Sequence, residues 1–115
     1  MSVSLLGVTA DELRAINRSF GGTKQLNSTV ESVFQSALYL PSFWEQVATV
    51  VRSVAGGHLF DNGNKRTAFE AVKLFRKRNQ IFTGTADHQV RETVRLVATH
   101  ILSDVQHIAK SLKGF

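Results

Sequence analysis

Residues 58–66, which read HLFDNGNKR, hold the densest group of chemically active side chains in the chain. Gly63 can take a positive φ angle and so lets the backbone come close to a ligand. Lys65 and Arg66 follow it, and an arginine can bind two phosphate oxygens at once. His58, at the other end of the stretch, is of the residue type that exchanges a proton near neutral pH. These residues indicate a phosphate-binding loop with a candidate general base.

Two oxygen-bearing side chains in the same stretch are candidates for binding magnesium. Asp61 and Asn62 offer the hard oxygen atoms that Mg²⁺ prefers, and this ion usually bridges a protein and nucleotide phosphates. The same residue types are also common turn formers and helix caps, so a purely local role stays open. Under either interpretation we expect Phe60 to anchor the loop in the hydrophobic core.

Helical periodicity on both sides predicts that two helices position this stretch. Apolar residues recur at helical spacing from Phe43 to Val54, and a glycine pair ends that helix just before the stretch. A new helix is predicted to start near Asn64, with apolar residues continuing to Phe75. The N-terminus of a helix presents free N–H groups and the positive end of the helix dipole, and both favour an anion.

The rest of the chain is also predicted to be helical. Thr9 and Glu12 have the spacing of a capping box, and Ser28 and Glu31 have the spacing of a second one. Pro41 breaks the pattern after the second helix. Two further helices are indicated by apolar residues at helical spacing, which are Val90, Val94, Val97 and Ile101 in one and Val105, Ile108 and Leu112 in the other. The predicted fold class is therefore all-α.

Length and composition predict one folded domain, residues 1–115. A chain of 115 residues with 43% hydrophobic residues can bury a single core. The absence of cysteine excludes disulfides and thiolate metal sites. No apolar run approaches the roughly 20 residues of a membrane span, and the start of the chain lacks the pattern of a signal peptide. The sequence therefore favours a soluble, cytoplasmic protein.

The basic charge indicates an acidic partner. The formal net charge is +5 and the sequence pI is about 10.1, values that suit nucleic acid, phosphate-bearing ligands or an acidic protein. The densest basic run, residues 73–78, falls at a predicted helix end, where cations complement the helix dipole. Nucleic-acid binding is therefore an alternative that rests on charge alone.

Residues 58–68 resemble the signature of the Fic/Doc family, in which histidine, a spaced phenylalanine, a glycine or alanine, asparagine and arginine recur over nine positions. From Asn64 to Ala68 the chain reads NKRTA, as in the Doc toxin branch, whereas typical Fic enzymes have Asn-Gly-Arg. The similarity extends from about Ala10 to Gln80. It implies a compact single-domain helical bundle, which in this family can carry a small β-hairpin flap before the motif.

The resemblance also implies a role for each motif residue. His58 would be the catalytic general base, and Phe60 would be the structural anchor of the loop. The residues implied to bind the nucleotide phosphates are Gly63, Asn64, Lys65 and Arg66. Asn62 stands where the family usually has an acidic magnesium ligand, and neighbouring Asp61 is a second candidate for that metal. A neutral amide binds magnesium more weakly than a carboxylate does.

The implied reaction is transfer of part of ATP, with Mg²⁺, onto a bacterial protein. Lys65 replaces the glycine that leaves room for the β-phosphate in typical Fic enzymes, which transfer AMP. In Doc-like members the nucleotide binds reversed, so transfer of the γ-phosphate to a serine or threonine is favoured and AMP transfer is the alternative. Elongation factor Tu is the target by analogy, and its modification would block growth.

A segment before the motif is the candidate for positioning the target. Members of the family pair the target backbone with a β-hairpin flap, and Leu38, Tyr39 and Leu40 lie where such a flap is expected. A helix end followed by a turn explains these residues equally well.

The sequence also predicts how the activity is controlled. Many Fic proteins carry an inhibitory helix with a serine or threonine four residues before a glutamate, and no glutamate of this chain has that partner. An antitoxin or immunity protein acting in trans, over the cleft around His58, is therefore expected. The site of action would be the bacterial cytosol, and delivery as a domain of a larger toxin stays open. An inactive Fic-like binding module is the alternative if Asn62 abolishes metal binding.

Overall fold

The computed structural model describes residues 3–114, which are mainly helical. Within these residues, two short strands are followed by six α-helices, and the third of these helices passes directly into a π-helix. In chain order the elements are β1 (Ser4–Leu5), β2 (Val8–Thr9), α1 (Ala10–Ser19), α2 (Val30–Ala37), α3 (Phe43–Val51), η1 (Arg52–Gly56), α4 (Asn64–Arg78), α5 (Asp87–Ala98) and α6 (Val105–Lys113). The prediction of an all-α fold is confirmed.

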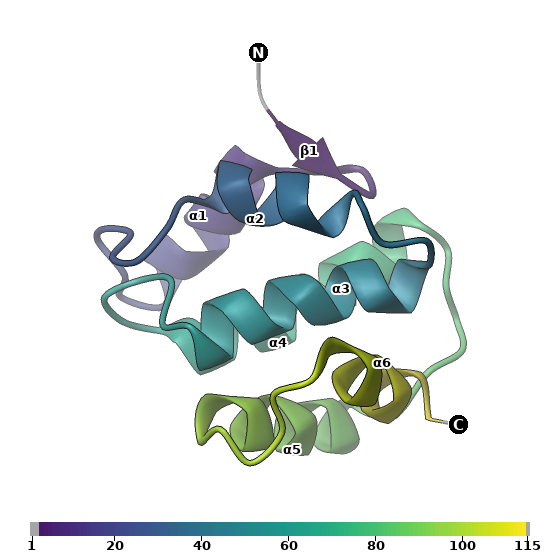
Figure 1. Ribbon diagram of the computed structural model, residues 1–115. Helices are drawn as coiled ribbons and strands as arrows, with labels where there is room; N and C mark the ends of the chain where they lie inside the picture. Colours follow the sequence, from purple (N-terminus) through teal and green to yellow (C-terminus); the bar gives the residue numbers. More distant parts are fainter. Residues whose placement is uncertain (1–2, 115) are drawn as a thin grey trace.

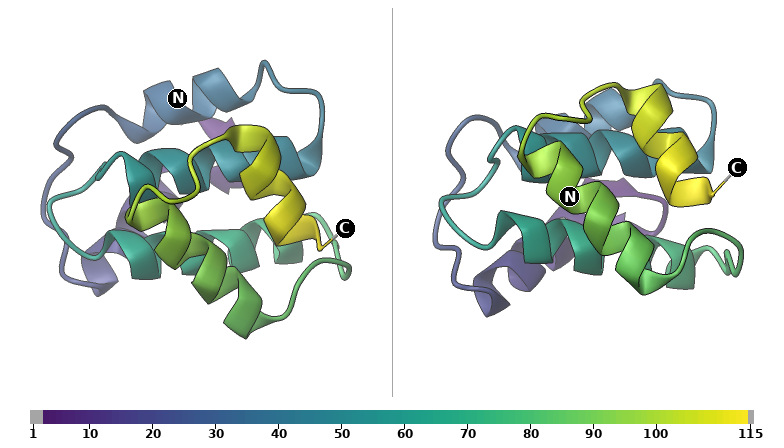
Figure 2. Two further views of the ribbon diagram at one scale, coloured as in Figure 1. Left: turned by 60° about the horizontal axis from the view of Figure 1, so that its bottom comes forward. Right: turned by 90° about the horizontal axis from the view of Figure 1, so that it is seen from below.

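The six helices lie in three layers of two (Figure 1). Helices α1 and α2 form the first layer, α3 and α4 form the middle layer, and α5 and α6 form the third. Within this stack α1 and α5 pack on opposite sides of α4, while α2 and α6 pack on α3. Figure 2 shows α5 and α6 crossing the middle layer from the side opposite to α1 and α2.

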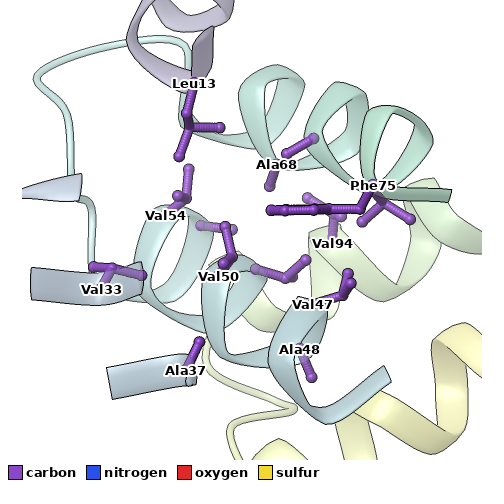
Figure 3. Close-up of a cluster of buried hydrophobic side chains, with 14 of the residues drawn as sticks. Leu13, Val33, Ala37, Val47, Ala48, Val50, Val54, Ala68, Phe75 and Val94 are labelled. Carbon is purple, nitrogen blue, oxygen red and sulfur yellow. The ribbon is translucent and has the colours of Figure 1, made fainter. Parts of the chain in front are cut away.

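The hydrophobic core fills the space between the layers. Figure 3 shows side chains pointing into this interior, among them Leu13 of α1, Val50 of α3, Phe75 of α4 and Val94 of α5. The ring of Phe75 packs edge-to-face against that of Phe34, with 6.3 Å between the ring centroids. Because buried residues of all six helices belong to one cluster, the middle helices are held from both sides.

The helix starts follow the predicted caps with one correction. The capping box at Thr9 and Glu12 is present, with hydrogen bonds of 2.9 and 3.1 Å. The second helix is capped by Thr29 and not by Ser28, because the hydroxyl that accepts from the backbone N–H of Ser32 is that of Thr29. The carboxylate of Glu31 instead accepts from Arg14 of α1, at 2.8 Å.

The small β-hairpin lies at the start of the chain and not in the segment before the motif. Strands β1 and β2 pair antiparallel, with Ser4 opposite Thr9. Leu38, Tyr39 and Leu40 form turns between α2 and α3, and the side chain of Tyr39 is 90% exposed.

The structure does not bring this turn, the predicted target-docking segment, next to His58. The turn precedes α3, whereas His58 follows η1. Because α3 and η1 form one helical run, the turn and His58 lie at its opposite ends, about 20 Å apart at 1.5 Å per residue.

Within residues 3–114, no helix is both long and apolar enough to cross a membrane.

Candidate active site

The candidate catalytic loop, residues 57–63, leaves the middle layer through a π-helical turn. The N–H of Gly57 donates to the carbonyl of Arg52 at 2.9 Å. This hydrogen bond spans one residue more than the corresponding bond of an α-helix does. His58 follows with a φ angle of 48°, in the left-handed region that few residues other than glycine adopt. Such π-turns and left-handed residues are frequent at functional sites. His58 is exposed, in the loop that joins η1 to α4.

The loop is pinned on one side by residues 23–26, which lie between α1 and α2. The N–H of Asp61 donates to the carbonyl of Lys24 at 3.0 Å, and Gln25 forms an antiparallel bridge with Phe60. The side chain of Phe60 is only 3% exposed, as expected of an anchor. Residues 23–26 therefore contact the loop, and the sequence did not predict this contact.

The carboxylate of Asp61 holds these two segments together. It accepts hydrogen bonds from the backbone N–H and the hydroxyl of Thr23 and from the N–H of Lys24. The hydrogen bond from the Thr23 hydroxyl is the main cause that lowers the pKa of Asp61 from 3.8 to about 2. Asp61 therefore acts first as a clamp on the loop.

This clamp predicts a dependence of stability on pH. A carboxyl group whose pKa is lowered on folding stabilises the fold above its unfolded pKa, near 3.8, and loses that contribution as the pH falls towards 2. We expect wild type to be more stable than Asp61→Asn at pH 5, with the difference shrinking by pH 2. Urea unfolding of both proteins at the two pH values measures it. A difference that stays constant with pH would show that the Asp61 carboxylate does not clamp the loop.

Asn64 closes the loop from the other side. Its side-chain oxygen accepts from the N–H of Phe60 at 3.0 Å, and its side-chain nitrogen donates to the carbonyl of Phe60 at 2.8 Å. Both side-chain groups thus bind the loop backbone. These two bonds fix the turn of the loop, and the binding of phosphate by Asn64 stays a prediction.

Two buried polar side chains that sequence reasoning missed support the same loop. Asn17 of α1 donates to the carbonyl of Asn62 at 2.8 Å and to the hydroxyl of Thr67 at 3.1 Å. Asn17 is 2% exposed and Thr67 is fully buried. The sequence did contain a signal for Asn17. This polar residue lies one helical turn after Leu13, on the face of α1 that is expected to be apolar.

The N-terminus of α4 is built to favour an anion. Gly63 is the N-cap residue with a φ angle of 70°, and no side chain of residues 3–114 caps the free N–H groups of the first turn. That turn contains Lys65 and Arg66 and no acidic residue. Cations at the positive end of a helix dipole are unfavourable, and a bound anion relieves both the dipole and the repulsion between these charges.

A pocket of about 340 Å³ opens beside this helix end, and we call it the α4–α5 pocket. Its lining residues are Phe20 of α1, Lys65, Arg66, Phe69 and Glu70 of α4, and Arg91, Val94 and Arg95 of α5. Arg91 and Arg95 were not assigned to the site from sequence. Their signal was a pair of arginines four residues apart, each next to an apolar core position of α5.

Comparison with known proteins assigns no family to this arrangement. No model of a known protein family matches the chain, and no curated protein matches it.

One further histidine lies at the site. The ring of His100, just after α5, packs edge-to-face against that of His58, with 6.1 Å between the ring centroids. Both residues have left-handed backbone conformations. This ring contact, which tertiary packing creates, distinguishes His100 from His88 and His107.

The two candidate magnesium ligands do not form a ready-made metal site. The carboxylate of Asp61 is engaged by Thr23 and Lys24, and the side-chain oxygen of Asn62 accepts from the N–H of Gly63 at 2.9 Å. Within residues 3–114, no three histidine, cysteine, aspartate or glutamate side chains are grouped to hold a metal ion. These donors therefore fit local turn and clamp roles better than a resident magnesium ion.

Proposed function

We propose that this protein is a nucleotide-dependent transferase that modifies a hydroxyl group of another protein. One observation carries the proposal: a single clamped loop joins an exposed histidine to an uncapped helix N-terminus flanked by Lys65 and Arg66. A base and an anion site at the two ends of one rigid loop are what phosphoryl or nucleotidyl transfer requires. The resemblance of residues 58–68 to the Fic/Doc motif supports the same chemistry.

The preferred reaction is transfer of the γ-phosphate of ATP to a serine or threonine. The hydroxyl oxygen of the target attacks the γ-phosphorus and forms the new P–O bond, while its proton passes to the imidazole of His58. The bond between the γ-phosphorus and the bridging oxygen breaks, and ADP leaves. Lys65, Arg66 and the N–H groups of α4 stabilise the negative charge of the phosphates.

The alternative reaction is AMP transfer. Here the same hydroxyl attacks the α-phosphorus, the proton again passes to His58, and pyrophosphate leaves. Kinase chemistry is preferred because Lys65 stands where AMP-transferring relatives in the resembled family have glycine.

The biological role proposed with this chemistry is that of a growth-blocking toxin acting in the bacterial cytosol. Elongation factor Tu is the proposed target, by analogy with the Doc branch. ATP is the proposed donor, with magnesium accompanying its phosphates. A separate antitoxin or immunity protein that covers the loop around His58 would keep the activity in check.

The test is label transfer in a bacterial lysate, with ATP labelled on either the γ- or the α-phosphate. A protein band labelled only from the γ-position is the expected result, and its mass identifies the target. A band labelled only from the α-position would establish AMP transfer and overturn the preference for kinase chemistry. No label from either position would leave a binding module without chemistry as the better description.

A further inference from the structure

The α4–α5 pocket contains two arginines that belong neither to the loop nor to α4. Arg91 and Arg95 lie one turn apart on α5 and line the same pocket as Lys65 and Arg66. Because α5 packs directly on α4, the two pairs of cations face one cavity from two helices. The pocket therefore extends the anion site beyond the helix N-terminus.

The charges in this pocket are poorly balanced. Among the residues that the structure describes, four cations line it, against the single carboxylate of Glu70. Arg95 has an exposed ion pair with Glu92, at 2.6 Å, whereas Arg91 has no carboxylate partner among residues 3–114. Like charges gathered in a pocket repel one another, and a bound polyanion removes that repulsion.

Aromatic rings orient two of these guanidinium groups. Arg66 lies over the ring of Phe20, 4.7 Å from its centroid, and Arg91 lies over the ring of Phe69, 4.4 Å from its centroid. A guanidinium that stacks on a ring keeps the N–H donors at its edge free, so it is prepared for bidentate binding of phosphate.

The same stacking argues against single-stranded nucleic acid as the ligand. Proteins that bind it use open aromatic faces on which bases stack. Here guanidinium groups cover one face of each of the two phenylalanine rings that line the pocket.

We propose that the α4–α5 pocket is a polyphosphate subsite, in which Arg91 and Arg95 bind the phosphates of a nucleoside triphosphate that the α4 N-terminus does not reach. The identity of the ligand as a nucleotide rests on the proposed function, whereas the preference for a polyanion rests on the pocket itself. A volume of about 340 Å³ is within the range of small-ligand sites. Arg91 and Arg95 would supply positive charge that a magnesium ion could otherwise bring. Asp61 and Asn62 are not arranged to bind such an ion.

Calorimetric titration with sodium triphosphate and with ATP, in the presence of a chelator, tests this subsite. Loss of one charge-assisted hydrogen-bonding group should weaken triphosphate binding by about tenfold or more in Arg91→Gln and in Arg95→Gln. Glutamine keeps much of the side-chain stem, so the packing of Arg91 on Phe69 is largely retained. Lys110→Gln removes one charge from an exposed position of α6 and is the matched control. Its triphosphate affinity should change by less than about twofold.

Each outcome has a defined meaning. Equal binding of triphosphate by wild type and both arginine variants, or no binding by wild type, would overturn the subsite. A single-stranded RNA oligonucleotide that binds while triphosphate does not would overturn it as well. A wild-type protein that binds triphosphate but transfers no label from ATP would count against the proposed function and leave the subsite intact.

Discussion

Replacing His58 with asparagine should reduce label transfer from ATP by at least about 100-fold, because general base catalysis typically contributes that much or more. Asparagine cannot take up the proton of the target hydroxyl. It also tolerates the left-handed backbone that His58 adopts, at a φ angle of 48°, so the loop should keep its shape. Initial rates of label transfer by the purified variant measure the effect.

The matched control is His88→Asn, in the exposed first turn of α5. This variant should transfer label at the wild-type rate. Thermal unfolding of both variants shows whether the substitutions leave the fold intact. A folded His58→Asn protein with near wild-type rates would rule out His58 as the base.

Gly63→Ala should lower the free energy of unfolding by about 3 kcal/mol, since the strain of a left-handed alanine adds to a steric clash. Gly63 has a φ angle of 70°, and a Cβ atom there would lie 2.7 Å from the carbonyl oxygen of Phe20. Either the start of α4 or the end of α1 must move to relieve this contact. Equilibrium urea unfolding at neutral pH measures the loss.

Gly21→Ala provides the matched control for this effect. Gly21 also has a positive φ angle, of 92°, but the nearest atom to an added Cβ is a side-chain nitrogen of Asn62 at 3.5 Å. The backbone strain alone should cost about 1–2 kcal/mol at this position. Equal losses in the two variants would show that the close approach of Gly63 to Phe20 adds no constraint.

The helices themselves could be predicted from the sequence, because their signals are local. Apolar residues at helical spacing placed α3, α4, α5 and α6 close to their observed positions. The capping box at Thr9 depends on residues three positions apart, and it was found for that reason. The second cap was misplaced by one residue, since Ser28 and Thr29 are adjacent and both residue types cap helices well.

The candidate loop could also be found from sequence, since its residues are consecutive. The contacts that each of these residues makes could not be found in this way. Asn64 and Phe60 are four residues apart, but their paired hydrogen bonds require the observed turn of the loop. The clamp between Thr23 and Asp61 and the bonds of Asn17 join residues more than 35 positions apart. Local spacing carries no information on such pairs.

The sequence by itself determined that the chain forms helices and that the loop following His58 leads into a helix N-terminus, because hydrophobic periodicity and residue type act over a few positions. Only the tertiary structure decided which distant side chains join that loop. The packing of α5 on α4 brings Arg91 and Arg95 into the same pocket as Arg66. The long run of α3 and η1 separates the turn at Tyr39 from His58. Both results depend on how helices stack in layers, which is fixed by the packing of the whole core.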